Sequence, residues 1–231
     1  MGARLRLLVM LLGGVLVVLT YTYPLWRPEP TVEVEREVFP GLAEELQAVF
    51  VELPPNVQNV YRRLASENQI SALERLEAHL SPPGPLPPEE AALPPVENAV
   101  IAASGEFRPI ELAEDDEREL PFYYNTLYRG TSGEVIIYQY PDGTRLLRIE
   151  ELQVINGPDL WVALSPNPQP VNGTNAELGS GYIEIAPLLT NQGDQNYTAV
   201  PDANNVNLNN YASVVIYDRS NQIIFGVAPI N

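Results

Sequence analysis

The 231-residue chain contains no cysteine, no lysine and one histidine, His79. The absence of cysteine excludes disulfides, thiol nucleophiles, iron–sulfur clusters and cysteine-ligated zinc. One histidine cannot build a histidine zinc site or a catalytic triad relayed by a second imidazole, and near a helix end we expect it to satisfy terminal carbonyls. No group of nucleophile, base and orienting residue is recognisable. We therefore expect a non-enzymatic protein with no catalytic residue, cofactor or metal.

Charge is just as one-sided. All 13 basic residues are arginines, and they stand against 30 carboxylates, which gives a net charge of -17. No run of basic residues could neutralise a phosphate backbone, so we expect no nucleic-acid partner. Residues 27–120 hold 20 acids and seven arginines, whereas residues 121–231 hold ten acids and four arginines. Most of the acidity therefore lies in the first half of the chain.

The amino terminus is apolar. Residues 7–26 carry no charge, follow Arg4 and Arg6, and end in an aromatic group of Tyr21, Tyr23 and Trp26. Twenty such residues are about the length that spans a ~30 Å hydrocarbon core, and the flanking charges and aromatics are typical of membrane boundaries. We expect residues 1–26 to be a single-pass signal-anchor that enters the lipid bilayer through residues 7–26. Its amino terminus would be cytoplasmic and the rest of the chain extracytoplasmic.

A cleaved secretory signal is the alternative. It needs small residues around a cleavage site, and no A-x-A pattern follows the apolar run. Both interpretations export everything after about residue 27.

Residues 27–80 are predicted to form an acidic helical spacer. Apolar residues recur there at helical spacing, and Pro54-Pro55 interrupts the pattern. These residues are Leu42, Leu46, Val49, Phe50, Val57, Val60, Tyr61, Leu64, Ile70, Leu73, Leu76 and Leu80. Ser66-Glu67 is a plausible helix start, and Ser81-Pro82-Pro83 a stop. Too few heptads are present to favour an oligomerising helix pair, so the oligomeric state stays open.

Residues 81–103 are predicted to be a proline-rich linker. Seven prolines fall within residues 81–95, a composition typical of an extended, semi-rigid segment that forms no packed element. After a further acidic patch at 113–119, charge falls and Tyr, Asn, Ile and Val become frequent. We expect a domain boundary near residues 96–104.

From residue 104 the hydrophobic pattern has a period of two. Residues 134–140 and 144–150 are β-rich runs around the turn Pro141-Asp142-Gly143, and residues 213–218 and 222–227 flank a second short turn. Residues 160–164 and 182–186 also alternate, with Glu184 expected on the solvent side. No helix is expected in this part. The fold class is mainly β, an antiparallel β-sandwich or open barrel at 104–231 behind a transmembrane helix and a short α-helical spacer.

Several motifs in this region resemble the DM13 domain. They are Gly157-Pro158-Asp159-Leu160, Leu164-Ser165, Leu178-Gly179, residues 191–197, residues 213–217 and Phe225-Gly226-Val227-Ala228, after opening strands at Ser104-Gly105-Glu106-Phe107 and Gly133-Glu134-Val135. The resemblance covers roughly residues 104–231, with the motifs in the right order.

The resemblance implies a β-sandwich module of extracellular proteins, related to the DOMON domain, with a proposed redox or electron-transfer role through a near-invariant cysteine. Bacterial members often stand behind a membrane anchor. The family motif places its cysteine directly after an Ile-Trp pair, whereas here Ile216-Tyr217 is followed by Asp218. A carboxylate cannot cycle through thiol, sulfenate and disulfide states, so the redox role is the alternative hypothesis for this chain.

The motif positions supply candidate functional residues. Those with polar or aromatic side chains are the ligand-binding candidates Asp159, Trp161, Asn196, Tyr197, Tyr217 and Asp218. Those expected to maintain the fold are Gly157, Pro158, Leu160, Gly193, Phe225 and Gly226. For Asp159 and Asp218, turn formation is favoured over contact with a ligand.

Calcium and sugars are two further ligand classes for this region. Asp194, Asp202 and the Asn-rich residues 204–210 could supply oxygens to calcium, but no regular calcium loop is present and turn formation is favoured. Nine of the 12 tyrosines lie in 121–231 and could stack on sugars, although core packing explains most of them.

The leading functional hypothesis is a membrane-anchored binding or structural module that recognises an envelope glycan or protein. Electron transfer is the alternative. A hydrolase with paired carboxylates is a distant third, because the separation of such a pair is a tertiary property.

Overall fold

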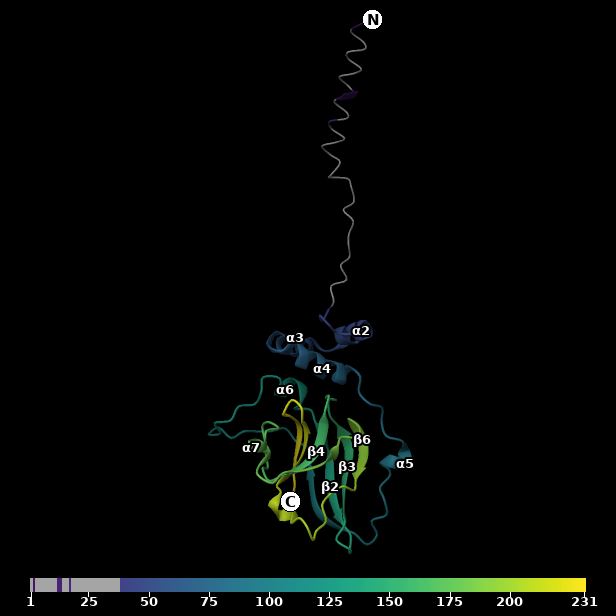
Figure 1. Ribbon diagram of the computed structural model, residues 1–231, viewed down its shortest axis with the longest axis vertical. Coiled ribbons are helices and arrows are strands. Elements are labelled where there is room, and N and C mark those ends of the chain that lie inside the picture. Colours follow the sequence, from purple (N-terminus) through teal and green to yellow (C-terminus); the bar gives the residue numbers. More distant parts are fainter. Residues whose placement is uncertain (1, 3–11, 14–16, 18–37) are drawn as a thin grey trace. The chain divides into compact units, whose positions relative to one another are not determined.

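The computed structural model describes residues 2, 12, 13, 17 and 38–231, and residues 38–231 form one compact unit (Figure 1). Most of the predicted anchor at 7–26 lies outside the described residues. Within the described part, no helix is both long and apolar enough to cross a bilayer.

Three helices precede the sheets, as the hydrophobic spacing predicts. They are α2 (Glu44–Glu52), α3 (Pro55–Glu67) and α4 (Gln69–Leu80). A proline opens α3, where a missing backbone N–H costs no hydrogen bond. The predicted helix start at Ser66-Glu67 is wrong, because α3 continues to Glu67 and the Asn68 side chain caps α4 by accepting from the Ser71 N–H.

The buried stripe of these helices follows the predicted spacing with two exceptions. Val57, Val60, Tyr61, Leu64 and Leu76 are buried, whereas Val49 and Ile70 are exposed. The helices lie at one end of the sheets (Figure 1), and α4 is tied there by its own side chains. Ser71 Oγ donates to Asn221 Oδ1 at 3.0 Å, and Arg75 Nη2 donates to Tyr128 Oη at 2.8 Å.

The proline-rich segment is not a free linker, which corrects the prediction of an unpacked stretch. It contains a one-turn helix, α5 (Pro88–Ala91), and strand β1 (Val100–Glu106) begins within its last residues. Asn196 Nδ2 donates to the carbonyls of Glu90 and Ala92, and Thr190 Oγ1 donates to that of Gly84. We refer to residues 84–92 as the strap, because they run along strand β6.

Eight antiparallel strands form a sandwich, which confirms the predicted fold class for this region. One sheet has the order β1-β2-β3-β6, with β2 (Ser132–Gln139), β3 (Arg145–Gln153) and β6 (Gln192–Tyr197). The other has the order β5-β4-β7-β8, with β4 (Leu160–Ser165), β5 (Ile183–Pro187), β7 (Ser213–Asp218) and β8 (Ile223–Pro229).

Alternate side chains of the strands point inward and fill the space between the two sheets. The fully buried residues include Val135, Ile137, Leu147 and Ile149 of the first sheet and Val162, Leu164, Val214 and Ile216 of the second. Both predicted hairpins are present, β2–β3 and β7–β8. At the first turn the Asp142 carboxylate accepts from the N–H and hydroxyl of Thr144, and Gly143 has a φ of 91°, which glycine adopts without strain.

Strand β7 is buried on both faces because a loop covers its outer side. This loop, residues 166–181, carries the one-turn helix α7 (Asn175–Leu178), and Ser165 Oγ donates to the Leu178 carbonyl. Two other short helices, α6 (Tyr124–Leu127) and the 3-10 helix η1 (Leu208–Asn210), lie in connections. The prediction that the distal region contains no helix is therefore wrong only for these three helices, each of about one turn.

The two sheets are joined along one side. Gly105 of β1 forms an isolated bridge with Ile230, and Ser104 and Asn231 exchange backbone hydrogen bonds. At Gly105 an added Cβ would lie 2.0 Å from the Pro229 carbonyl oxygen. Only glycine permits this approach of β1 to β8.

Candidate functional site

Trp161 and Tyr217 are direct neighbours across the β4–β7 pair. In an antiparallel sheet such partners point to the same face, here the outer face under loop 166–181. The Tyr217 ring is 1% exposed, and a Cβ at Gly173 would lie 2.8 Å from it. Two residues of the sequence-derived candidate set therefore meet at one place.

Each of these aromatic side chains donates its polar hydrogen to a carboxylate. Trp161 Nε1 donates to Asp159 Oδ1 at 2.9 Å, and Tyr217 Oη donates to Glu184 Oε1 at 2.5 Å. Burial and the adjacent Glu184 raise the pKa of the Tyr217 hydroxyl above its ordinary value. The Glu184 side chain is 31% exposed, between the solvent-facing position expected and a buried one.

Arg219 connects the two pairs. Its guanidinium carbon lies 4.1 Å from the centre of the Trp161 ring, while its Nε is 3.3 Å from Asp159 Oδ2 and its Nη1 is 3.9 Å from Glu184 Oε2. Ser220 Oγ also donates to Asp159. Burial alone would raise the pKa of Asp159, but the hydrogen bonds from Ser220 and Trp161 and the charge of Arg219 together outweigh it, and the pKa is lowered. We call Asp159, Trp161, Glu184, Tyr217 and Arg219 the Trp–Tyr site.

Asp218 points into the sandwich end instead of the outer face. It is fully buried, pairs with Leu160 in the strand register, and accepts from the N–H and Nδ2 of Asn221 at 3.0 and 2.8 Å. Burial raises the pKa of this carboxyl, although the Asn221 hydrogen bonds act in the opposite direction. Because Ser71 of α4 donates to Asn221, and Asn221 donates to Asp218, this carboxylate lies close to α4.

Sequence reasoning missed a buried arginine beside this carboxylate. Arg75 is 5% exposed, its guanidinium lies 4.6 Å from the centre of the Tyr123 ring, and its Nε has no hydrogen-bond partner in the part of the chain that the structure describes. The signal was available, because Ala72, Arg75 and Leu76 share one stripe of α4. An arginine within an apolar stripe indicates a polar contact across the interface.

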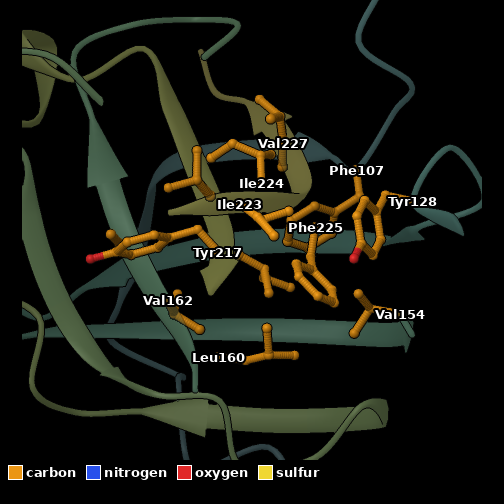
Figure 2. Close-up of a cluster of buried hydrophobic side chains, with 14 of the residues drawn as sticks. Phe107, Tyr128, Val154, Leu160, Val162, Tyr217, Ile223, Ile224, Phe225 and Val227 are labelled. Atoms are coloured by element: carbon orange, nitrogen blue, oxygen red, sulfur yellow. The ribbon is translucent and has the colours of Figure 1, made fainter. Parts of the chain in front are cut away.

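Aromatic side chains continue from this arginine into the core. Tyr128 lies 5.8 Å from Tyr123 and 4.1 Å from Phe225, measured between ring centres. Figure 2 shows Phe107, Tyr128 and Phe225 gathered on one side of the cluster, and the Tyr217 hydroxyl pointing away from it on the other. In the helices, Tyr61 Oη lies 2.9 Å from His79 Nδ1, so His79 bonds a phenol and not the helix-end carbonyls expected.

Asn196 and Tyr197 do not join the Trp–Tyr site. They lie on β6, in the other sheet, where Asn196 holds the strap and Tyr197 Oη donates to Gln195 Oε1 at 2.6 Å. The same strand carries Gly193, with a φ of 80°. These two of the six ligand-binding candidates therefore have internal structural partners.

The positions expected to maintain the fold lie in close packing. A Cβ at Gly157 would lie 2.8 Å from the Phe225 ring, and one at Gly226 would lie 2.7 Å from Thr131 Cγ2. Leu160 is buried at the start of β4, directly after the turn that holds Pro158.

The oxygen-rich residues weighed for calcium are also engaged elsewhere. Asp194 Oδ2 accepts from Arg148 at 2.6 Å, and its Oδ1 accepts from the Glu151 N–H. Across residues 38–231, no group of three or more His, Asp or Glu side chains is arranged to hold a metal ion.

A solvent-open hollow of about 760 Å³ lies between the strap and the first sheet. Its lining residues are Pro85, Glu106, Phe107, Ser132, Gly133, Glu134, Glu151, Leu152, Gln153, Gln192 and Gly193. Three carboxylates and two amides give this surface the chemistry of a polar or cationic ligand site.

Comparison with known proteins gives one match. Residues 122–230 fit the model of a family described as Electron transfer DM13. No curated protein and no solved structure matches the chain.

Proposed function

The chain is a DM13 domain-containing protein, with that domain at residues 122–230, and from this premise we propose that it is a non-enzymatic module that exchanges single electrons outside the cytoplasmic membrane. The description of the family supports electron exchange. The chain has no cysteine, so a thiol cannot carry it. Tyrosine and tryptophan are the remaining side chains that can give up one electron at moderate cost.

The observation that carries the proposal is the geometry of the Trp–Tyr site. Two oxidisable rings lie opposite each other on β4 and β7, and each has a carboxylate within hydrogen-bond distance of the proton it would lose. An acceptor at that distance is what proton transfer from an oxidised ring requires.

Voltammetry of the full-length protein, adsorbed on an electrode without added cofactor, tests this function. We expect a reversible one-electron wave. An absorption spectrum of protein purified from its native membrane is the companion measurement. A visible band would show that a bound chromophore, and not a side chain, carries the electron. Absence of both the wave and the band would overturn the proposal.

The membrane location rests on the apolar segment 7–26, with Arg4 and Arg6 before it. Washing membranes with alkaline carbonate should leave the full-length chain in the pellet, and protease added outside the cytoplasmic membrane should cut the distal part. Release of the intact chain into the supernatant would contradict an uncleaved anchor. Protection of the distal part from that protease would contradict the orientation.

A binding or structural role at the envelope is the second candidate, favoured by the hollow beneath the strap. Its acidic and amide lining suits hydroxyl-rich or cationic groups of an envelope glycan or protein. Retention of residues 38–231 on cell-wall or polysaccharide fractions, lost in Glu134→Gln, would support it. Failure to bind any fraction would count against it.

A further inference from the structure

Sulfur is missing from the whole described core of this protein. The two methionines are Met1 and Met10, both at the amino terminus, and cysteine is absent. In residues 38–231, one-electron chemistry by side chains therefore falls to tyrosine and to Trp161. Which of them loses the electron depends on where the proton goes and on the nearby charges.

The described tyrosines differ in what accepts the phenolic proton. Tyr217 Oη donates to the carboxylate of Glu184, whereas Tyr197 donates to a neutral amide and Tyr211 to the backbone carbonyl of Gly181. Amide and carbonyl oxygens are poor bases, and a carboxylate takes up a proton readily. Tyr217 therefore has an acceptor that the other two lack.

Tyr61 is the competing candidate, because its hydroxyl lies 2.9 Å from His79. Burial lowers the pKa of His79, which makes its imidazole a weaker proton acceptor. Arg75 also acts electrostatically on Tyr61, and a nearby cation opposes removal of an electron. The positive charge of Arg75 thus disfavours oxidation of Tyr61, whereas the negative charge of Glu184 favours oxidation of Tyr217.

Trp161 competes within the Trp–Tyr site itself. Its ring lies 4.1 Å below the Arg219 guanidinium. A cation over the ring face is attracted by the π electrons of the neutral indole and repelled by the positive charge that oxidation leaves there. Arg219 therefore makes oxidation of Trp161 harder and leaves Tyr217 as the easier donor.

We propose that Tyr217 is the redox residue of this domain, that Glu184 is its proton acceptor, and that Arg219 is a positioning residue that directs oxidation to Tyr217 and away from Trp161. This inference rests on the proposed electron-transfer function. The oxidant is of the class of strong one-electron acceptors able to oxidise a phenol.

The step balances in atoms and charge. One electron passes from Tyr217 to the oxidant, the phenolic O–H bond breaks, and the proton forms a new O–H bond on Glu184 Oε1. The products are a neutral phenoxyl radical, a neutral carboxylic acid and an oxidant reduced by one electron. Return of an electron to the radical and of the proton to Oη restores the resting state.

Photo-oxidation of the full-length protein tests the assignment. Tris(bipyridine)ruthenium(III), generated by light with a sacrificial electron acceptor, is the oxidant, and the radical is identified by freeze-quench electron paramagnetic resonance and by absorption. We expect a phenoxyl radical in the natural protein and its loss in Tyr217→Phe. Glu184→Gln keeps a hydrogen-bond acceptor but removes the base, so radical formation should slow by about a hundredfold to ten-thousandfold.

The control variants separate the competing residues. Tyr211→Phe should leave the radical unchanged, as should Tyr61→Phe, and Arg219→Gln should add an indolyl signal from Trp161. A phenoxyl radical that survives in Tyr217→Phe, or disappears in Tyr61→Phe, overturns the assignment even if the voltammetric wave is present. Absence of the wave from the natural protein is the distinct failure of electron transfer itself.

Discussion

Asp218 is a carboxylate that the solvent does not reach. Burial opposes its ionisation, and the folded protein raises its pKa above the value of about 3.8 in an unfolded chain. For such a group the stabilising contribution is complete below the unfolded pKa and is lost as the pH rises through the folded one. Ionisation of Asp218 therefore works against folding at neutral pH.

Replacement of Asp218 by asparagine should flatten the pH dependence of the free energy of unfolding above pH 4. Asparagine cannot ionise, and its amide oxygen still accepts from Asn221. Denaturant unfolding followed between about pH 4 and 7 is the measurement. Asp218→Ala should instead lose about 1–3 kcal/mol, because the Asn221 donors are left without an acceptor.

Asp142→Asn is the control, because the pKa of Asp142 is shifted in the opposite direction to that of Asp218. Hydrogen bonds from the Thr144 side chain and N–H lower the pKa of Asp142, so its contribution is lost as the pH falls. A pH dependence in Asp218→Asn as steep as that of the natural protein would contradict the account of Asp218.

At the scale of residues, the sequence indicates which side chains belong to a motif better than it indicates what those side chains contact. The motif around Asp159 and Trp161 could be recognised because turn and strand residues stand in a fixed local order. The pairing of Trp161 with Tyr217, and the burial of Asp218, depend on segments far apart in the chain. The place of Arg75 in the apolar stripe of α4 could be read from the sequence, but its partner Tyr128, which belongs to another element, could not.

At the scale of elements, the contact of β1 with β8 depends on one glycine. Gly105→Ala places a Cβ against the Pro229 carbonyl, so either strand must move. We expect a loss of about 1–3 kcal/mol or more in the free energy of unfolding. The melting temperature of Gly105→Ala is compared with that of Gly130→Ala, whose added Cβ meets no atom within 4 Å. Equal melting of both variants would show that the contact is not tight.

The strap is attached through Arg148, whose side chain is 5% exposed. Its guanidinium donates to Glu150, Asp194, Asn196 and the Ala91 carbonyl. Arg148→Met should lower stability by about 2 kcal/mol, since charged hydrogen-bond partners are left behind but keep some contact with water.

Hydrogen exchange should also quicken at the backbone amides of residues 84–92 in Arg148→Met. Arg129→Met removes an arginine from an exposed pair with Glu111 and is the matched control. Unchanged protection of the strap in Arg148→Met would mean that other contacts hold it.

The strands were predictable because the period-two alternation of apolar and polar residues is visible within each short run of consecutive residues. Residues 134–140, 160–164 and 213–218 each lie in a strand near the expected bounds. The strap was not predictable, because proline content indicates an extended backbone but does not reveal what the backbone lies against. Its hydrogen bonds come from β6 and Arg148, about 50 to 100 residues further along the chain.

At the scale of the molecule, α2–α4 cover one end of the sandwich although the family match begins only at residue 122. Without them Asn221, Tyr128 and Asn156 would each lose a hydrogen bond to α4. A fragment of residues 81–231 should be roughly 3 kcal/mol less stable than one of residues 38–231, about 1 kcal/mol per bond. Denaturant unfolding of both fragments is the measurement, and equal midpoints would show that the helices are an independent unit.

Strand β8 completes the structure on two sides, by pairing with β7 and by bridging to β1. It is also the last of the eight strands to leave the ribosome. During synthesis β7 must therefore wait with one edge unpaired, and the barrier to closure is dominated by contacts distant in sequence. The nascent protein consequently depends on protection from aggregation until β8 is available, because the sandwich cannot close before that strand has been made.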